Sequence, residues 1–131
     1  MIGLATNLLV RYLAQDDPVQ SPRASAIIEQ LNPDDPGFVS IVAVTEMVWV
    51  LKRAYKLADT EIAAAIERIL QADVLVVESE QEVFTAMTAL KEGRGSFSDA
   101  LIGAIGLKAG CTRTLTFDRK SARLGGFELV A

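Results

Sequence analysis

The stretch Met1-Ile2-Gly3-Leu4-Ala5-Thr6-Asn7-Leu8-Leu9 decides the fold, because an apolar strand here runs directly into small and amide-bearing residues and then into a new apolar run. A strand that is apolar on both sides is more typical of the centre of a sheet than of its edge. Its carboxyl end, from Ala5 to Asn7, is where an open α/β sheet places its ligand site. Ala5, the residue best placed to point into that site, carries no reactive group.

Further along the chain, apolar strands alternate with helices over short connections. After the first strand, the expected strands are residues 38–41, 74–77, 114–117 and 127–130, and the expected helices are 8–13, 21–31, 45–55, 59–71, 79–92 and 99–109. This alternation predicts an α/β protein of three layers, with a mostly parallel central sheet of four to five strands flanked by helices. The length of 131 residues predicts one domain over residues 1–131.

The composition excludes several kinds of site. The chain has no histidine, which excludes Ser-His-Asp, Cys-His and imidazole acid–base schemes. Its single cysteine has no second thiol with which to form a disulfide or a soft-metal site. No apolar run approaches the length of a membrane span and no signal peptide is recognisable, so we expect a cytoplasmic protein without membrane contact. Catalysis would have to rest on carboxylates, amines or a metal held by oxygen.

The net charge of −4 hides an asymmetry along the chain. Residues 1–90 carry 6 Lys/Arg and 13 Asp/Glu, whereas residues 91–123 carry 7 Lys/Arg and 3 Asp/Glu. The second segment could attract an anionic polymer although the whole protein is acidic. On local charge alone, the candidates for phosphate contact are Arg94, Arg113, Arg119 and Lys120; the alternative is that each is ordinary solvated surface.

Three carboxylates occupy positions that could converge. Glu46 lies in the expected first turn of a helix that Thr45 could cap, Asp99 follows a possible cap at Ser98, and Asp118 directly follows a strand. Residues beyond parallel strand ends and at helix starts meet at one edge of a sheet. Two such charges about 4 Å apart repel by roughly 4 kcal/mol at an effective dielectric near 20. Mg²⁺ or Mn²⁺ with hard oxygen ligands usually relieves this repulsion.

Each candidate also has a purely structural explanation. Glu46 and Asp99 are favoured in a first helical turn by the helix dipole alone, and Asp118 could be a turn or cap residue. Thr6 and Asn7 could simply cap the first helix. The single tryptophan, Trp49, is interpreted as a packing residue or an oligomer contact, not as a platform for base stacking.

Four segments together resemble the PIN-domain family, specifically the VapC-type toxins of bacterial toxin–antitoxin pairs. They are residues 1–13, Thr45-Glu46, Phe97-Ser98-Asp99-Ala100-Leu101-Ile102 and Leu115-Thr116-Phe117-Asp118. They occur in the order of the family and cover essentially the whole chain. The resemblance implies a parallel sheet flanked by helices and a metal-dependent cleavage of RNA, often a structured RNA such as transfer RNA.

The resemblance also assigns the acids. Glu46, Asp99 and Asp118 match the acidic metal-site positions of the family, and Ala5 stands where its first acid is found. An isolated loss in a preserved motif favours a deliberate Asp→Ala change that disarms a toxic nuclease; the alternative is a naturally degenerate member. With one of four crowded acids removed, we expect this protein to melt higher in the absence of Mg²⁺ than a version with Asp at position 5.

The implied mechanism uses one or two Mg²⁺ or Mn²⁺ ions. Asp99 and the acid at position 5 would be principal ligands, while Glu46 and Asp118 would bind through waters or orient the attacking water. Asn7 and Thr116 could fix the geometry around them. The implied partners are an antitoxin protein, the RNA substrate and a second copy of the chain in a homodimer or larger toxin–antitoxin assembly. The alternative is a non-catalytic PIN-fold module that binds RNA or its antitoxin.

Overall fold

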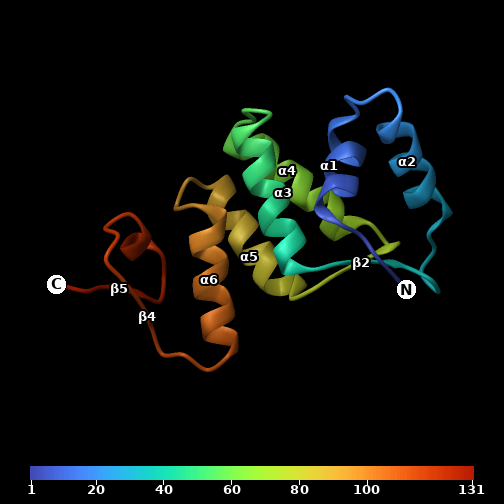
Figure 1. Cartoon of the computed structure of the whole chain (residues 1–131). Helices are drawn as coiled ribbons and strands as arrows, with labels where there is room; N and C mark the ends of the chain where they lie inside the picture. Colours follow the sequence, from blue (N-terminus) through green and yellow to red (C-terminus); the bar gives the residue numbers. More distant parts are fainter. The chain divides into compact units, whose positions relative to one another are not determined.

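The computed structural model describes all 131 residues and divides them into two compact units, Met1–Glu78 and Ser79–Ala131 (Figure 1). Each unit contains helices and parallel strands, which confirms the predicted α/β class. The prediction of one domain over residues 1–131 stays a prediction. None of the helices combines the length and the apolar character that a membrane span requires.

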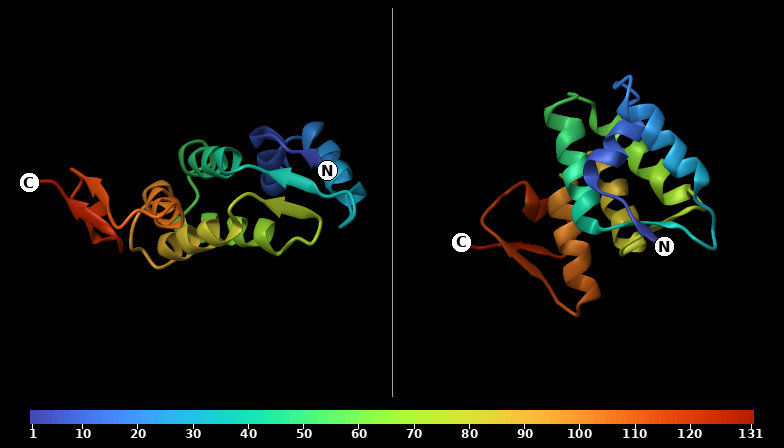
Figure 2. Two further views of the ribbon diagram at one scale, coloured as in Figure 1. Left: turned by 90° about the horizontal axis from the view of Figure 1, so that it is seen from below. Right: turned by 45° about the vertical axis from the view of Figure 1, so that its right-hand side comes forward.

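The first unit alternates strands with helices. Its elements are β1 (Ile2–Gly3), α1 (Thr6–Ala14), α2 (Gln20–Gln30), β2 (Gly37–Val39), α3 (Ile41–Arg53), α4 (Asp59–Gln71) and β3 (Leu75–Val77). The three strands form a parallel sheet in the order β1-β2-β3 (Figure 2). Helix α1 packs against α2 and α3, and α3 packs against α4.

Within the three-stranded sheet of the first unit, β1 pairs with β2 alone, and its predicted central position stays a prediction. The backbone amides of Ile2 and Leu4 donate to the carbonyls of Pro36 and Phe38, and both bonds lie on the side of β2. Ile2 is 49% exposed. An apolar composition predicts that a strand forms but does not specify its neighbours, because the order of strands depends on long-range crossovers.

Gly37 explains how closely β1 and β2 approach. A Cβ atom at this position would lie 2.8 Å from Cδ1 of Leu4 and 2.9 Å from Cδ1 of Leu31, which is closer than real Cβ contacts allow. Leu4 and Leu31 are both buried. The absent side chain therefore makes room for Leu4, the residue that precedes Ala5, and for Leu31.

The second unit consists of two helices followed by a small sheet. Its elements are α5 (Glu80–Lys91), α6 (Phe97–Lys108), β4 (Thr114–Thr116), the short 3₁₀ helix η1 (Ser121–Arg123) and β5 (Phe127–Leu129). Helices α5 and α6 pack along each other, and β4 and β5 pair in parallel (Figure 2). The chain thus has the five strands predicted, divided between a three-stranded and a two-stranded sheet.

Helices α1, α3 and α6 each begin at least two residues earlier than predicted, and α3 shows the reason. The hydroxyl of Ser40 accepts from the amide of Ala43 at 3.1 Å and caps α3, whereas Thr45 lies inside the helix and donates to the carbonyl of Ile41. The predicted cap at Thr45 was therefore wrong, and α3 starts directly after β2. As a result, Glu46 lies in the second turn of its helix, where the dipole at the helix start has little influence.

Helix α6 shows the same displacement. The hydroxyl of Ser96, not of Ser98, caps it by accepting from the amide of Asp99 at 3.1 Å. Asp99 remains in the first turn, where the partial positive charge of the helix end favours a carboxylate.

Candidate functional site

The predicted site residues fall into two groups, one in each unit. Ala5, Asn7 and Glu46 line a groove between α1 and α3 of the first unit, which we call the α1–α3 groove. Asp99 and Asp118 come together in the second unit, and we call them the aspartate pair. The convergence of Glu46 with the aspartate pair stays a prediction.

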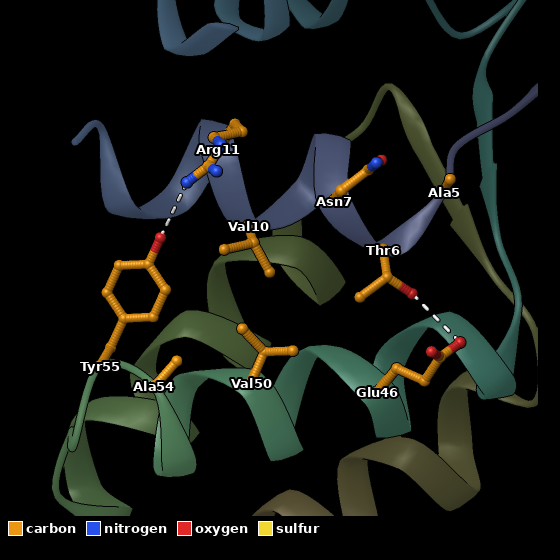
Figure 3. A pocket seen from close by; sticks show the side chains of 9 residues that line it. All are labelled: Ala5, Thr6, Asn7, Val10, Arg11, Glu46, Val50, Ala54 and Tyr55. Atoms are coloured by element: carbon orange, nitrogen blue, oxygen red, sulfur yellow. Dashed lines mark hydrogen bonds between the residues drawn. The ribbon is translucent and has the colours of Figure 1, made fainter. Parts of the chain in front are cut away.

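The α1–α3 groove has a volume of about 570 Å³. It is lined by Ala5, Thr6, Asn7, Val10, Arg11, Glu46, Val50, Ala54 and Tyr55. Val10 and Val50 face each other across its middle, while polar side chains stand at its two ends (Figure 3). A ligand in this groove would meet an apolar centre between two polar ends.

One end of the groove holds Glu46. The hydroxyl of Thr6 donates to Oε1 of Glu46 at 3.4 Å, at the long limit for such a bond (Figure 3). Glu46 is exposed and forms no ion pair, so its carboxylate is available to a cation. Asn7 lines the same groove. Sequence reasoning considered Thr6 only as a helix cap; its position next to Ala5 was the signal for a role beside Glu46.

Ala5 is the N-cap residue of α1. Its backbone is extended, with φ −81° and ψ 162°, and no side chain accepts from the free amides of the first turn. Ala5 itself is exposed and borders the groove that contains Glu46. Alanine is among the poorest N-cap residues, and Asp and Asn are among the best. An aspartate at position 5 would therefore have two opposite effects on stability. It would stabilise the start of α1 as an N-cap, and it would destabilise the protein by repelling Glu46.

We expect Ala5→Asn to raise the free energy of unfolding by about 1 kcal/mol, because its side chain caps α1 without adding charge. Ala5→Asp provides the same cap but places a second negative charge beside Glu46, so without metal Ala5→Asp should be less stable than Ala5→Asn. Mg²⁺ should then raise the stability of Ala5→Asp and leave that of Ala5→Asn unchanged. Urea denaturation at low salt, with and without Mg²⁺, measures all three proteins. Equal stabilities of the two variants in both conditions would contradict charge crowding at this position.

The other end of the groove carries Arg11. Its Nη1 donates to the hydroxyl of Tyr55 at 3.1 Å and lies 3.4 Å from Oδ1 of Asp16, while its Nε donates to Gln20 at 2.8 Å. Burial and the hydrogen bond to Asp16 raise the pKa of Tyr55, which keeps the phenol protonated. Arg11 is the one cation among the groove residues, and the sequence analysis did not single it out.

The aspartate pair is held by a single hydroxyl. Oγ of Ser121 lies 2.8 Å from Oδ2 of Asp99 and 3.0 Å from Oδ2 of Asp118. Ser121 is only 4% exposed, and its one proton can serve one carboxylate at a time. The serine therefore brings two acids from distant parts of the chain to within two hydrogen bonds of each other. Sequence reasoning missed Ser121, although its spacing of three residues from Asp118 was available.

The carboxylate of Asp118 is kept ionised by its surroundings. The pKa of Asp118 is lowered, chiefly by the backbone N–H of Lys120, which donates to Oδ1 at 2.9 Å, and next by the hydroxyl of Ser121. The amide of Asp118 donates in turn to the hydroxyl of Thr116 at 3.0 Å. This bond fixes the backbone turn at Asp118, and the predicted role of Thr116 in the geometry of a metal site stays a prediction.

The donor set of the aspartate pair matches the chemistry of a hard divalent cation. Two carboxylates and a hydroxyl supply only oxygen, the preferred ligand atom of Mg²⁺ and Mn²⁺. Neither unit contains a cluster of three or more acidic, histidine or cysteine side chains that could hold a metal by itself. Two acids alone leave most positions of an octahedral cation to water or to further ligands.

The four basic residues predicted to contact phosphate differ in whether they form salt bridges. Arg94 pairs with Glu92 at 2.8 Å, and Arg113 pairs with Glu128 at 2.8 Å. Arg119 and Lys120 form no salt bridge and directly follow Asp118 in the chain. These two cations are therefore the better placed to receive a phosphate near the aspartate pair.

The model of the PIN domain family matches residues 4–126, a span that includes Ala5, Glu46, Asp99 and Asp118. The chain belongs to the PIN domain family. A VapC ribonuclease from Aquifex aeolicus (strain VF5) is 24% identical to it over 122 residues, which is 93% of this chain and 90% of that protein. The resemblance noted in the sequence is thus confirmed at the level of the PIN domain, and the relation to this VapC ribonuclease is distant.

Proposed function

We propose that this PIN domain is an Mg²⁺- or Mn²⁺-dependent endoribonuclease toxin of a type II toxin–antitoxin pair, and that Ala5 leaves it with little or no cleavage activity. The observation that carries the proposal is the aspartate pair, two carboxylates held together by one buried hydroxyl in a chain related to a VapC ribonuclease. Two adjacent carboxylates repel each other and so destabilise the protein unless a cation lies between them. Their proximity is therefore explained best by a reaction that depends on a bound cation.

In this proposal Asp99 and Asp118 hold the cation through their carboxylate oxygens, and Ser121 keeps both in position. A divalent cation, when bound, supplies Lewis-acid stabilisation of the charge that develops on the phosphate during hydrolysis. Glu46 orients the water that attacks the phosphodiester. Ala5 provides no ligand, so the first family acid is missing.

The remaining residues position the substrate and the acids. Arg119 and Lys120 receive phosphates of the RNA, and Arg94 and Arg113 contribute after release from their ion pairs. Asn7 and Thr116 support the geometry from the groove and from the turn before Asp118. We further propose a structured RNA such as a transfer RNA as substrate, a cognate antitoxin as partner and a homodimer or larger toxin–antitoxin assembly, as the resemblance to VapC-type toxins implies.

Cleavage of RNA by the Ala5→Asp variant tests this function. The variant should cut a total transfer RNA preparation in Mg²⁺ and should stop in excess chelator. If it cuts no RNA in either condition yet still binds RNA or an antitoxin, the chain is the non-catalytic PIN module that was the alternative.

Ser121→Ala should lower the cleavage rate of the Ala5→Asp variant by about 10- to 100-fold, the usual cost of losing a group that orients metal ligands. Without the hydroxyl, nothing bonds Asp99 to Asp118, and their repulsion turns the carboxylates apart. The rate at several Mg²⁺ concentrations separates weaker cation binding from slower chemistry. Ser98→Ala, at an exposed serine two positions after the α6 cap, is the control and should change little. An unchanged rate in Ser121→Ala would remove the serine from the site.

A further inference from the structure

Helix α3 exposes the only tryptophan of the chain. Trp49 is 61% exposed, so it is not a core packing residue of this chain, and the alternative of an oligomer contact stays a prediction. The guanidinium carbon of Arg53 lies 5.3 Å from the centre of its ring, within the range of a cation–π contact. Aromatic side chains with a polar edge are enriched at interfaces, and the adjacent cation gives this ring a second group with which to hold a ligand.

The position of this pair on α3 relates it to the α1–α3 groove. Trp49 and Arg53 follow Glu46 by three and seven residues, which places all three on the same side of the helix. Glu46 also lines the groove, together with Val50 on the neighbouring strip of the helix. The aromatic ring therefore stands one helical turn from the acid at the end of the groove.

The charges around Trp49 favour an anionic ligand. Lys52, Arg53 and Lys56 bring three cations to the last turn of α3 and the residues after it, and only Lys52 is paired, with Asp59 at 3.2 Å. An aromatic ring flanked by cations is how proteins hold single-stranded nucleic acid, with the base on the ring and the phosphates on the positive charges.

We propose that Trp49 stacks against an unpaired base of the RNA whose phosphodiester is brought to Glu46, and that Arg53 completes the stack. The proposal rests on the proposed function, because it names the contact by which the nuclease recognises a single-stranded stretch. Arg53 orients the ring and places its charge beside the adjacent phosphate. Every base has an aromatic face, so this contact selects unpaired RNA over duplex and not one sequence over another.

Fluorescence of the protein as it stands tests the proposal, since Trp49 is the sole tryptophan and reports only on this surface. The probe is a ten-residue oligouridylate in excess chelator, with an abasic ribose-phosphate oligomer of equal length as the matched control. We expect saturable quenching by the oligouridylate and an affinity for the abasic oligomer that is about 5- to 150-fold lower. Equal quenching by both oligomers, or none by either, overturns the stacking contact.

Variants give a second measurement, the anisotropy of a labelled oligouridylate. Trp49→Ala should weaken binding about 5- to 150-fold and Trp49→Phe less, because phenylalanine retains a smaller stacking face. Phe84→Ala, at an aromatic side chain of α5 that is 55% exposed, is the control and should bind normally. Unchanged binding by Trp49→Ala, or a fluorescence change that depends on protein concentration and not on RNA, overturns the proposal; the latter would place a second copy on this face.

The outcomes separate this inference from the proposed function. If Ala5→Asp cleaves RNA in Mg²⁺, and Trp49→Ala introduced into that variant leaves RNA binding and cleavage unchanged, the proposed nuclease function is supported and the stacking contact is refuted. If the oligouridylate quenches the fluorescence of Trp49 while Ala5→Asp cleaves no RNA, the stacking contact is supported and the proposed nuclease function is refuted.

Discussion

Ala5→Asp is expected to raise the rate of Mg²⁺-dependent RNA cleavage by more than about 100-fold over the protein with Ala5. Groups that merely orient metal ligands are worth about 10- to 100-fold, and a carboxylate at position 5 would be a ligand itself. The position suits the task, since Ala5 is exposed at the start of α1 and borders the groove that contains Glu46. The measurement is the initial rate on transfer RNA under single-turnover conditions in Mg²⁺, in Mn²⁺ and in excess chelator.

Ala5→Asn is the matched control for this result. Its side chain has the shape of aspartate and caps α1 equally well, but it lacks the negative charge. If Ala5→Asn gained as much activity as Ala5→Asp, the gain would come from a better-ordered α1 and not from a ligand. Equal cleavage by Ala5→Asp in excess chelator would instead refute the dependence on a divalent cation.

Asp99→Asn, introduced into the Ala5→Asp variant, should abolish the restored activity and return the rate to that of the protein with Ala5. The amide keeps the size of the side chain but removes the charge that binds a cation. Its backbone amide still donates to Ser96, so the first turn of α6 is retained. The same cleavage assay measures the loss, and calorimetric titration with Mn²⁺ tests whether cation binding is lost with it.

Asp73→Asn controls for the loss of one negative charge anywhere on the protein. Asp73 is exposed and forms no salt bridge, so its neutralisation should leave cleavage within about twofold of the Ala5→Asp variant. Retention of full activity by the Asp99→Asn variant would exclude Asp99 as a ligand, whatever the outcome at position 5.

The sequence predicted the class of the fold better than the limits of its elements. Alternation of apolar strands and helices was enough for an α/β protein with parallel strands. The starts of α3 and α6 were placed too late, because Thr45 and Ser98 are as suitable for an N-cap as Ser40 and Ser96. Which hydroxyl caps a helix depends on where the preceding segment ends, and composition does not specify that.

The candidate site was predicted in part for a similar reason. Glu46, Asp99 and Asp118 could be chosen because carboxylates after strands and at helix starts form a recognisable pattern. Thr6 and Arg11 could not be chosen from the sequence. Thr6 contacts Glu46 and Arg11 contacts Tyr55 only because α1 packs against α3. Local residue type predicts what a side chain can do, whereas packing decides which side chain it meets.

By itself, the amino-acid sequence determined the α/β class, the absence of imidazole chemistry, the acids available for a hard cation and the unusual Ala5 at the start of α1. Only the tertiary structure showed that Ser121 joins Asp99 to Asp118 and that Trp49 faces water beside Glu46. The reason is physical: hydrophobic periodicity is a local property of the chain. A hydroxyl shared by two carboxylates, or a helix face that no neighbour covers, exists only after distant segments have packed.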